Sequence, residues 1–230
     1  GTIEEIIKGL VTGCKNANMA LIAGETAEMP DLYKPGEFDL AGFIVGVVDR
    51  SKIIDGSKIE AGDVVLGFKS NGLHTNGYTL ARKIVFEHMG WGPDKHFDEL
   101  GTSIGEALLT PHKLYLPVIE KLRDESSVKG FAHVTGGGIV GNLSRIFRDG
   151  LSFEIDTSKW EIPPVFTILQ EAGNVETKEM FRAFNMGIGL TCVVSEDGAG
   201  EMVKSFTDSE DKPIVIGRVM EGKEPQLNLD

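Results

Sequence analysis

The stretch His133-Val134-Thr135-Gly136-Gly137-Gly138 constrains the fold of this chain most, because three consecutive glycines separate two segments of different periodicity. The segment 128–132 is short and mostly apolar, as in a strand, and residues 139–147 carry apolar side chains near helical spacing. A strand that turns through glycines into a helix exposes several backbone N–H groups in one concavity. Such a turn favours an anion such as phosphate, although a bare triple glycine is about as often a helix-entry turn without a ligand. The neighbouring His133 and Thr135 favour the ligand.

Composition and charge limit the class of protein. The 230 residues are 41% hydrophobic and 25% charged, which is typical of a globular protein with one large domain or two smaller ones. No run approaches the roughly 20 apolar residues of a membrane helix, and no leader opens the chain, so we expect a cytoplasmic protein without membrane contact. The 35 acidic residues outnumber the 23 basic ones, and the net charge of −12 argues against nucleic acid as a partner.

The first 62 residues predict only part of a domain. A helix begins near Thr2 with a capping-box pattern and runs toward Asn16, and apolar runs at residues 19–23 and 40–48 predict two strands. One helix and two strands cannot close a core, so this segment either packs on later parts of the chain or belongs to a domain that has lost its beginning. Residues 49–62 are polar and punctuated by glycine, and we place a domain boundary there, with residues 1–55 before it.

Residues 56–230 alternate strands and helices and predict one complete domain. Some connections are too short for parallel crossovers, so we expect an α+β (mixed α/β) fold with mixed sheets and flanking helices. The expected strands are residues 64–68, 128–132, 151–155, 187–194 and a closing strand at 213–219. The expected helices follow residue 78 and occupy residues 104–109, 114–122 (with Pro111 near its start), 139–147, 163–171, 176–184 and 198–206.

Three loops carry residues suited to chemistry, and the first is residues 24–30, directly after the first predicted strand. Glu25, beside Thr26, could supply a carboxylate for Mg²⁺, which takes one or two protein carboxylates and completes its shell with water and phosphate. The alternative is a solvated turn glutamate without a ligand, and the spacing alone favours this second interpretation.

The other two loops, residues 70–78 and 133–138, each place a histidine among glycines. His74 can move a proton near neutral pH and Asn76 can orient an amide or a hydroxyl, although a lone histidine in a turn is more often structural. His133 lies directly beside the triple glycine.

Four other polar side chains receive less weight. Asn185 precedes a strand, where it could lie at a cleft, although core or turn packing explains it equally well. No functional role is expected for the remaining histidines, which are His88, His96 and His112.

Four motifs occur in a fixed order along the chain, and their residues are Gly24-Glu25-Thr26-Ala27-Glu28-Met29-Pro30, Gly72-Leu73-His74-Thr75-Asn76-Gly77-Tyr78, His133-Val134-Thr135-Gly136-Gly137-Gly138 and Phe184-Asn185-Met186-Gly187-Ile188-Gly189. Together they closely resemble the phosphoribosylformylglycinamidine cyclo-ligases, also called aminoimidazole ribonucleotide synthetases, of purine biosynthesis. The stretches between the motifs agree as well, so the resemblance spans nearly the whole chain. Residues 28–30 and 74–78 favour this family over related synthetases and kinases of its superfamily.

The resemblance implies an ATP-dependent ring closure. Formylglycinamidine ribonucleotide and ATP give aminoimidazole ribonucleotide, ADP and phosphate: ATP activates the formamide oxygen as a phosphoryl ester, a nitrogen attacks, and phosphate leaves. An amide oxygen is a poor leaving group, and phosphorylation makes it a good one while Mg²⁺ and N–H donors bear the charge. The family also implies a homodimer.

The resemblance also implies a role for each matching position. His74 and His133 are expected to be catalytic, one of them in proton transfer or orientation, and which one does so stays open. Substrate binding is expected from a set that places the substrate phosphate on glycines, namely Asn76, Thr135, Gly136, Gly137, Gly138 and Asn185. Glu25 and Thr26 are expected near ATP, with Glu25 as the metal ligand.

One departure from the family matters more than any substitution. Family members carry a further segment of roughly 100 residues, most of a domain, before the present Gly1, and it supplies most ATP and Mg²⁺ contacts. We therefore expect residues 1–55 to be the end of the ATP-binding domain, and the fragment alone to be inactive. Two alternatives stay open: another ATP-dependent synthetase of the superfamily, such as a formylglycinamidine ribonucleotide synthase, or a non-catalytic binding module.

Overall fold

The computed structural model describes residues 1–229, and the chain divides into two units, residues 1–53 and residues 54 onward. Each unit is described by itself. None of the helices among the described residues combines the length and the apolar character that a membrane span requires.

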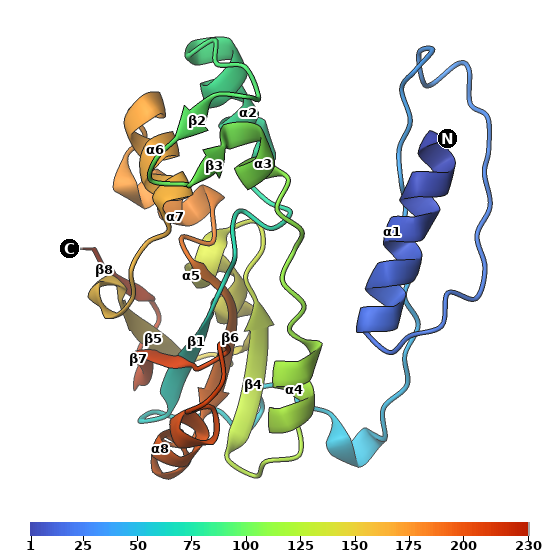
Figure 1. Cartoon of the computed structure of the whole chain (residues 1–230). Coiled ribbons are helices and arrows are strands. Elements are labelled where there is room, and N and C mark those ends of the chain that lie inside the picture. Colours follow the sequence, from blue (N-terminus) through green and yellow to red (C-terminus); the bar gives the residue numbers. More distant parts are fainter. Residues whose placement is uncertain (230) are drawn as a thin grey trace. The chain divides into compact units, whose positions relative to one another are not determined.

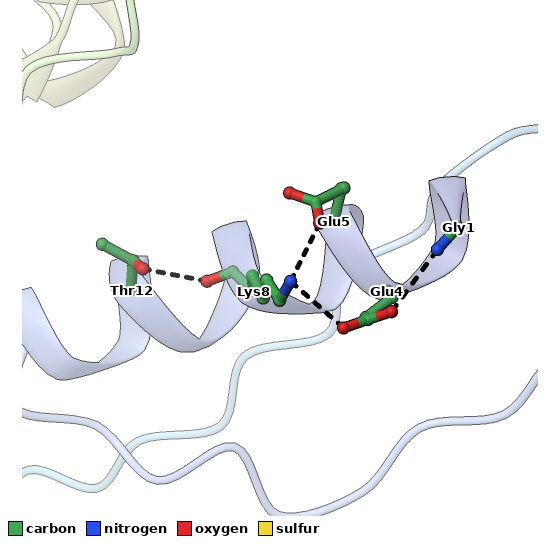
Figure 2. A network of polar contacts seen from close by, with 5 residues as sticks. All are labelled: Gly1, Glu4, Glu5, Lys8 and Thr12. Carbon is green, nitrogen blue, oxygen red and sulfur yellow. Dashed lines mark hydrogen bonds and ion pairs between the residues drawn. The ribbon is translucent and has the colours of Figure 1, made fainter.

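The first unit contains one long helix, α1 (Thr2–Asn16), followed by chain without regular structure and a 3₁₀ turn, η1 (Arg50–Lys52) (Figure 1). The N-cap of α1 is Gly1, so Thr2 is the first helical residue and does not cap the helix as expected. Lys8 lies between two carboxylates, with its Nζ 3.1 Å from Glu4 and 2.9 Å from Glu5 (Figure 2). These groups are exposed, so they support a solvated helix face and form no ligand site.

The two strands expected at residues 19–23 and 40–48 do not form, and this prediction was wrong. Within the first unit no strand is found, and the apolar side chains of both runs are exposed, for example Ile22 at 86% and Phe43 at 99%. A strand needs a neighbouring strand to pair its backbone N–H and C=O groups, and residues 1–53 offer none.

The second unit is built on a six-stranded sheet with the strand order β4-β6-β1-β7-β5-β8 (Figure 1). Adjacent strands are antiparallel except β5 and β8, which pair in parallel, so the expected mixed sheet is confirmed. The bounds are β1 (Val64–Lys69), β4 (Val128–His133), β5 (Leu151–Asp156), β6 (Ile188–Val194), β7 (Ile214–Glu221) and β8 (Gln226–Asn228). A separate two-stranded ribbon consists of β2 (His96–Phe97) and β3 (Thr102–Ser103).

Helices cover both faces of the large sheet, and their bounds are α2 (Tyr78–Arg82), continued by a π-helix η2 (Lys83–His88), α3 (Ile104–Leu108), α4 (Leu116–Leu122), α5 (Gly138–Leu143), the 3₁₀ turns η3 (Ser144–Ile146) and η4 (Thr157–Lys159), α6 (Pro164–Gly173), α7 (Thr177–Ala183) and α8 (Glu196–Ser205). Alternation along β1 sends Val65 into one core and Leu66 into the other. The first core includes Phe166 of α6, and the second includes Val118 of α4 and Met202 of α8.

Two details of the second unit differ from expectation. The strand at residues 213–219 does not close the domain, because β8 follows it; β8 is three residues long and mostly polar, which gave no strand signal. The proline in the first turn of α4 is Pro117, while Pro111 lies several residues before that helix.

The register of the sheet brings three connections to one edge. Lys69 at the end of β1 pairs with Ile188 at the start of β6, and His133 at the end of β4 pairs with Leu190 of β6. Because β6 lies between β1 and β4, the loops that follow β1 and β4 leave the sheet where the chain enters β6. His74 lies in the loop after β1, His133 is the last residue of β4, and Asn185 lies in the segment that leads into β6.

Candidate functional site

The three loops at this edge are tied together by hydrogen bonds. The backbone N–H of Val134 donates to Gly189 O at 2.9 Å, and that of Ser70 donates to Gly187 O at 2.8 Å. Asn76 lies against the triple-glycine turn, since a Cβ placed on Gly136 would lie 3.5 Å from Asn76 Oδ1. Residues far apart in sequence therefore share one small region of the second unit.

Asn185 joins two of these loops from a buried position. Its Oδ1 accepts hydrogen bonds from Ser70 Oγ at 2.8 Å and from the Gly187 N–H at 2.9 Å, and its Nδ2 donates to Gly72 O at 2.8 Å. The side chain is 3% exposed. An amide that is already satisfied on both sides positions loops, and this favours a supporting role over direct contact with a substrate.

The triple-glycine turn depends on backbone geometry that other residues rarely adopt. Gly137 and Gly138 have φ angles of +98° and +64°, and a Cβ on Gly138 would clash with the carbonyl oxygen of Phe181. The Thr135 hydroxyl donates to Asn142 Oδ1 at 2.9 Å, and Asn142 Nδ2 donates to Gly138 O at 2.8 Å, which holds the turn from inside. Helix α5 is only six residues long, so the N–H groups of the turn matter more here than the helix dipole.

Three histidines meet beside this turn: His74 from the loop after β1, His112 from the connection between α3 and α4, and His133 from the end of β4. The rings of His74 and His112 stack with centroids 3.9 Å apart and planes 29° apart. The Nε2 atoms of His112 and His133 are 2.9 Å apart, and His112 Nδ1 is 2.6 Å from Lys113 O. His112 was expected to have no role, and no sequence signal separated it from His88 or His96; only the folded chain brings it to His133.

His74 is the buried member of this cluster, which we call the histidine cluster (His74, His112 and His133). It is 4% exposed and has a left-handed φ of +62°, uncommon for a residue other than glycine. Its Nε2 lies 3.0 Å from Asn71 Oδ1, while its Nδ1 is buried without a hydrogen-bond partner in the part of the chain that the structure describes. Asn71 is fixed in turn, because its Nδ2 donates to Pro111 O at 2.9 Å.

Burial keeps two members of the histidine cluster neutral. Burial, with smaller effects from His112, His133 and Lys113, lowers the pKa of His74 from its ordinary 6.5 to about 3. Burial and then His112 also lower the pKa of His133. Both imidazoles are therefore uncharged at neutral pH, and each keeps one nitrogen lone pair for a proton or a ligand.

Tyr115 packs against the histidine cluster. Its hydroxyl donates to Lys69 O at 2.9 Å, burial raises its pKa, and its ring makes edge contacts with His74 and His112. A Cβ on Gly189 would collide with the Tyr115 hydroxyl and the His74 ring, so glycine is required at that point of β6. The histidine cluster is thus packed against Tyr115 and against fixed backbone of β1 and β6.

The structure leaves Glu25 and Thr26 in the first unit. Both side chains are exposed and lie in a segment without regular structure, and neither makes a hydrogen bond or ion pair within the described residues. An exposed, unpaired carboxylate such as that of Glu25 is chemically suited to be one ligand of Mg²⁺.

Two hollows are lined by residues that do not belong to these loops. One, of about 1040 Å³, runs along α1 and is wide open. The other, of about 540 Å³, is lined by the start of β5 and the segment after β7, including Arg148, Ser152 and Lys223. The expected site residues line neither hollow, so the case for them rests on loop geometry.

The second unit is a mixed sheet covered by helices, and its glycine-bordered loops gather at one edge. Known families can be compared with this fold and site. The family described as AIR synthase related protein, C-terminal domain, matches residues 60–230, and the corresponding N-terminal domain family matches residues 1–48. This chain belongs to the AIR synthase related protein family.

Curated relatives agree with this assignment over nearly the whole chain. A protein named phosphoribosylformylglycinamidine cyclo-ligase from a strain of Bacillus cereus is 46% identical over 96% of this chain and 64% of its own length. A protein of the same name from Thermoanaerobacter sp. (strain X514) is 44% identical over 96% of this chain and 66% of its own length. The chain thus spans about two thirds of the relatives that it matches.

Solved structures support the fold alone. A thiamine-monophosphate kinase from Stenotrophomonas maltophilia K279a superposes with a TM-score of 0.53 at 16% identity, covering 79% of this chain and 54% of the kinase. A chain of a HypE–HypF complex gives a TM-score of 0.52 at 20% identity and covers 75% of this chain and 51% of its own.

Proposed function

We propose that residues 56–230 form the substrate side of an ATP-dependent phosphoribosylformylglycinamidine cyclo-ligase, which closes formylglycinamidine ribonucleotide to aminoimidazole ribonucleotide. The observation that carries this proposal is 46% identity over 96% of the chain to a relative of that name. Residues 1–55 would then belong to the ATP-binding domain. The protein would act in the cytoplasm as a homodimer, without nucleic acid or membrane as a partner.

The substrate phosphate is placed on the triple-glycine turn. Gly136 and Gly137 offer backbone N–H groups that donate no hydrogen bond within the described residues, and glycine allows ligand oxygens to approach closely. Asn76, which lies against Gly136, is exposed enough to contact the substrate. Thr135 and Asn185 support the site from behind, since their polar atoms bond within the protein.

His133 is the better placed of the two expected catalytic histidines. It is neutral at neutral pH and more exposed than His74, so one of its nitrogens can take the proton that the attacking nitrogen loses. His74 is buried and packs against His112, which in turn bonds His133, so its role is to position the other two rings. His133 is therefore the proposed general base.

ATP supplies the phosphoryl group that turns the formamide oxygen into a leaving group. Glu25 would contribute one carboxylate to the accompanying Mg²⁺, and Thr26 would lie near the nucleotide phosphates. The amidine-side nitrogen then attacks the activated carbon and loses its proton, the C–O bond breaks, and phosphate departs with the oxygen.

The test is an assay of the protein encoded by the natural gene, with formylglycinamidine ribonucleotide, ATP and Mg²⁺. One aminoimidazole ribonucleotide, one ADP and one phosphate should form together. Thiamine monophosphate serves as the competing substrate, because the fold is shared with a thiamine-monophosphate kinase. Substrate-independent ATP hydrolysis, or phosphorylation of thiamine monophosphate instead, would refute the proposed reaction, and tight binding without turnover would favour a binding module.

A further inference from the structure

We propose that the histidine cluster is a binding site for one divalent transition-metal ion of the Zn²⁺ class. Its three residues each offer one ring nitrogen, and these nitrogens lie within 4.8 Å of one another. Zinc binds histidine nitrogen at about 2.0–2.1 Å in tetrahedral geometry, which places two ligand nitrogens roughly 3.3 Å apart. The three imidazoles are therefore near the spacing that a single ion requires.

His112 and His133 form the primary pair. Lys113 O can only accept a hydrogen bond, so the nitrogen of His112 that donates to it, Nδ1, carries the proton and Nε2 keeps its lone pair. That lone pair accepts a hydrogen bond from His133 Nε2 at 2.9 Å, so a bound ion would take the place of the proton that the two nitrogens share. A backbone carbonyl that fixes the tautomer of an imidazole is the usual second partner of a histidine that ligates metal.

His74 is the third ligand. His74 Nε2 lies 3.0 Å from Asn71 Oδ1 and 3.4 Å from the backbone nitrogen of Asn71, whereas His74 Nδ1 is a buried atom without a partner among the described residues. A buried ring nitrogen without a hydrogen-bond partner costs free energy, and binding a metal ion through that nitrogen can remove this cost. The stacked rings of His74 and His112 do not yet point their lone pairs at one place, so one ring must rotate, and we expect His74 to contribute less than the other two.

The donor set determines which metal is expected. Three imidazoles without a carboxylate suit Zn²⁺, Cu²⁺ or Ni²⁺ and disfavour Mg²⁺ and Ca²⁺. Lys113 is the nearby cation, and Asp211 pairs with it at 2.7 Å, which reduces its repulsion of a bound ion. Burial decreases from His74 through His112 to His133, so the fourth coordination position faces solvent, where water or a ligand can occupy it.

This site shares His133 with the proposed cyclisation and does not include Glu25, the proposed ligand of Mg²⁺. An ion on His133 would occupy a nitrogen that the proposed reaction uses for proton transfer, so metal-loaded and catalytically competent states would exclude each other. Binding can be measured on the 230-residue chain without turnover. A failure of metal binding thus leaves the proposed reaction untouched, and the reverse also holds.

The experiment titrates the metal-free 230-residue chain with Zn²⁺ by calorimetry and with Co²⁺ by visible absorption. One ion per chain should bind with a Kd below about 10 µM, and Co²⁺ should show the intense absorption of a tetrahedral site. His112→Gln and His133→Gln should each weaken binding at least about tenfold. Both positions are less buried than His74, so these variants should keep the native circular dichroism.

His96→Gln is the matched control, because His96 is exposed and lies outside the cluster. Its affinity should equal that of the unsubstituted chain, and Cys14→Ser should also leave the Co²⁺ spectrum unchanged. Equal affinity in the His112→Gln, His133→Gln and His96→Gln proteins would overturn the proposal, as would the absence of a one-to-one Zn²⁺ complex in the folded chain.

Discussion

Both units of this molecule contain similar apolar runs, but the runs are exposed in the first unit and buried in the second. Val47 in the first unit is fully exposed, whereas Val65 in the second is completely buried. The difference lies in available partners: β1 has strands on both sides and helices on both faces, and residues 40–48 have neither within their own unit. A β-branched apolar run therefore becomes a strand only where a neighbouring strand can pair with it.

The largest expected effect is a loss of turnover, and it tests whether the catalytic base lies in the second unit. In the protein encoded by the natural gene, His133→Ala should lower kcat by about 10²–10⁴-fold, because it removes the proposed general base. Stability should change little, since His133 is not part of the core. Steady-state kinetics and urea unfolding check both statements, and unchanged kcat would remove His133 from the catalytic site.

The next prediction compares the units directly with one substitution in each. Phe166→Ala should lower the free energy of unfolding by about 3–5 kcal/mol, because it leaves a cavity in the core beneath α6. Phe43→Ala should change it by less than about 0.5 kcal/mol, because that ring is exposed. Urea denaturation of both variants provides the measurement. A large loss in Phe43→Ala would mean that residues 40–48 are covered in solution.

A third prediction concerns pH and the buried His74. Its pKa is about 3 when folded and about 6.5 when unfolded, so the unfolded chain binds more protons between these values and stability falls as the pH falls. From pH 6.5 to pH 5 the loss should be about 1.6 kcal/mol, less than the full 1.36 kcal/mol per pH unit because the unfolded His74 is only half protonated at pH 6.5. Urea unfolding with a chelator present measures the slope, and His74→Gln should reduce it by this amount, while His133, whose pKa is also lowered, contributes a further slope of the same sign. An identical slope in both proteins would contradict the assignment.

The sequence predicted the second unit well because its signals were local and consistent. Apolar runs bordered by glycine gave β1, β4 and β6, and the loops between them carried recognisable motifs. It failed at residues 19–23 and 40–48, where strand formation depends on a partner outside the run, and at β8, whose polar residues pair only because β5 offers an edge. His112 escaped notice because its nearness to His133, 21 residues away, depends on how two loops pack.

The smallest expected effect uses two glycines with the same backbone strain. Gly36 and Gly137 have φ angles of +88° and +98°, and neither would bring an added Cβ into a severe clash. Gly137→Ala should cost about 1–2 kcal/mol, because β4 and α5 hold its backbone in place. Gly36→Ala should cost less than about 0.5 kcal/mol, because no packed core fixes that turn and it can relax.

Valine substitutions of the same two glycines distinguish a structural role of the glycine from a role in substrate binding. In the protein encoded by the natural gene, Gly137→Val should abolish affinity for formylglycinamidine ribonucleotide while ATP binding persists, because the side chain covers the N–H groups proposed to hold the substrate phosphate. Calorimetry with each ligand measures the two affinities, and Gly36→Val is the control, with no loss of substrate affinity expected. Normal substrate binding by Gly137→Val would move the phosphate away from the triple-glycine turn, even if the stability difference between the two alanine variants were as expected. The two regions would then differ in packing alone, and the glycines would serve only the entry of the chain into α5.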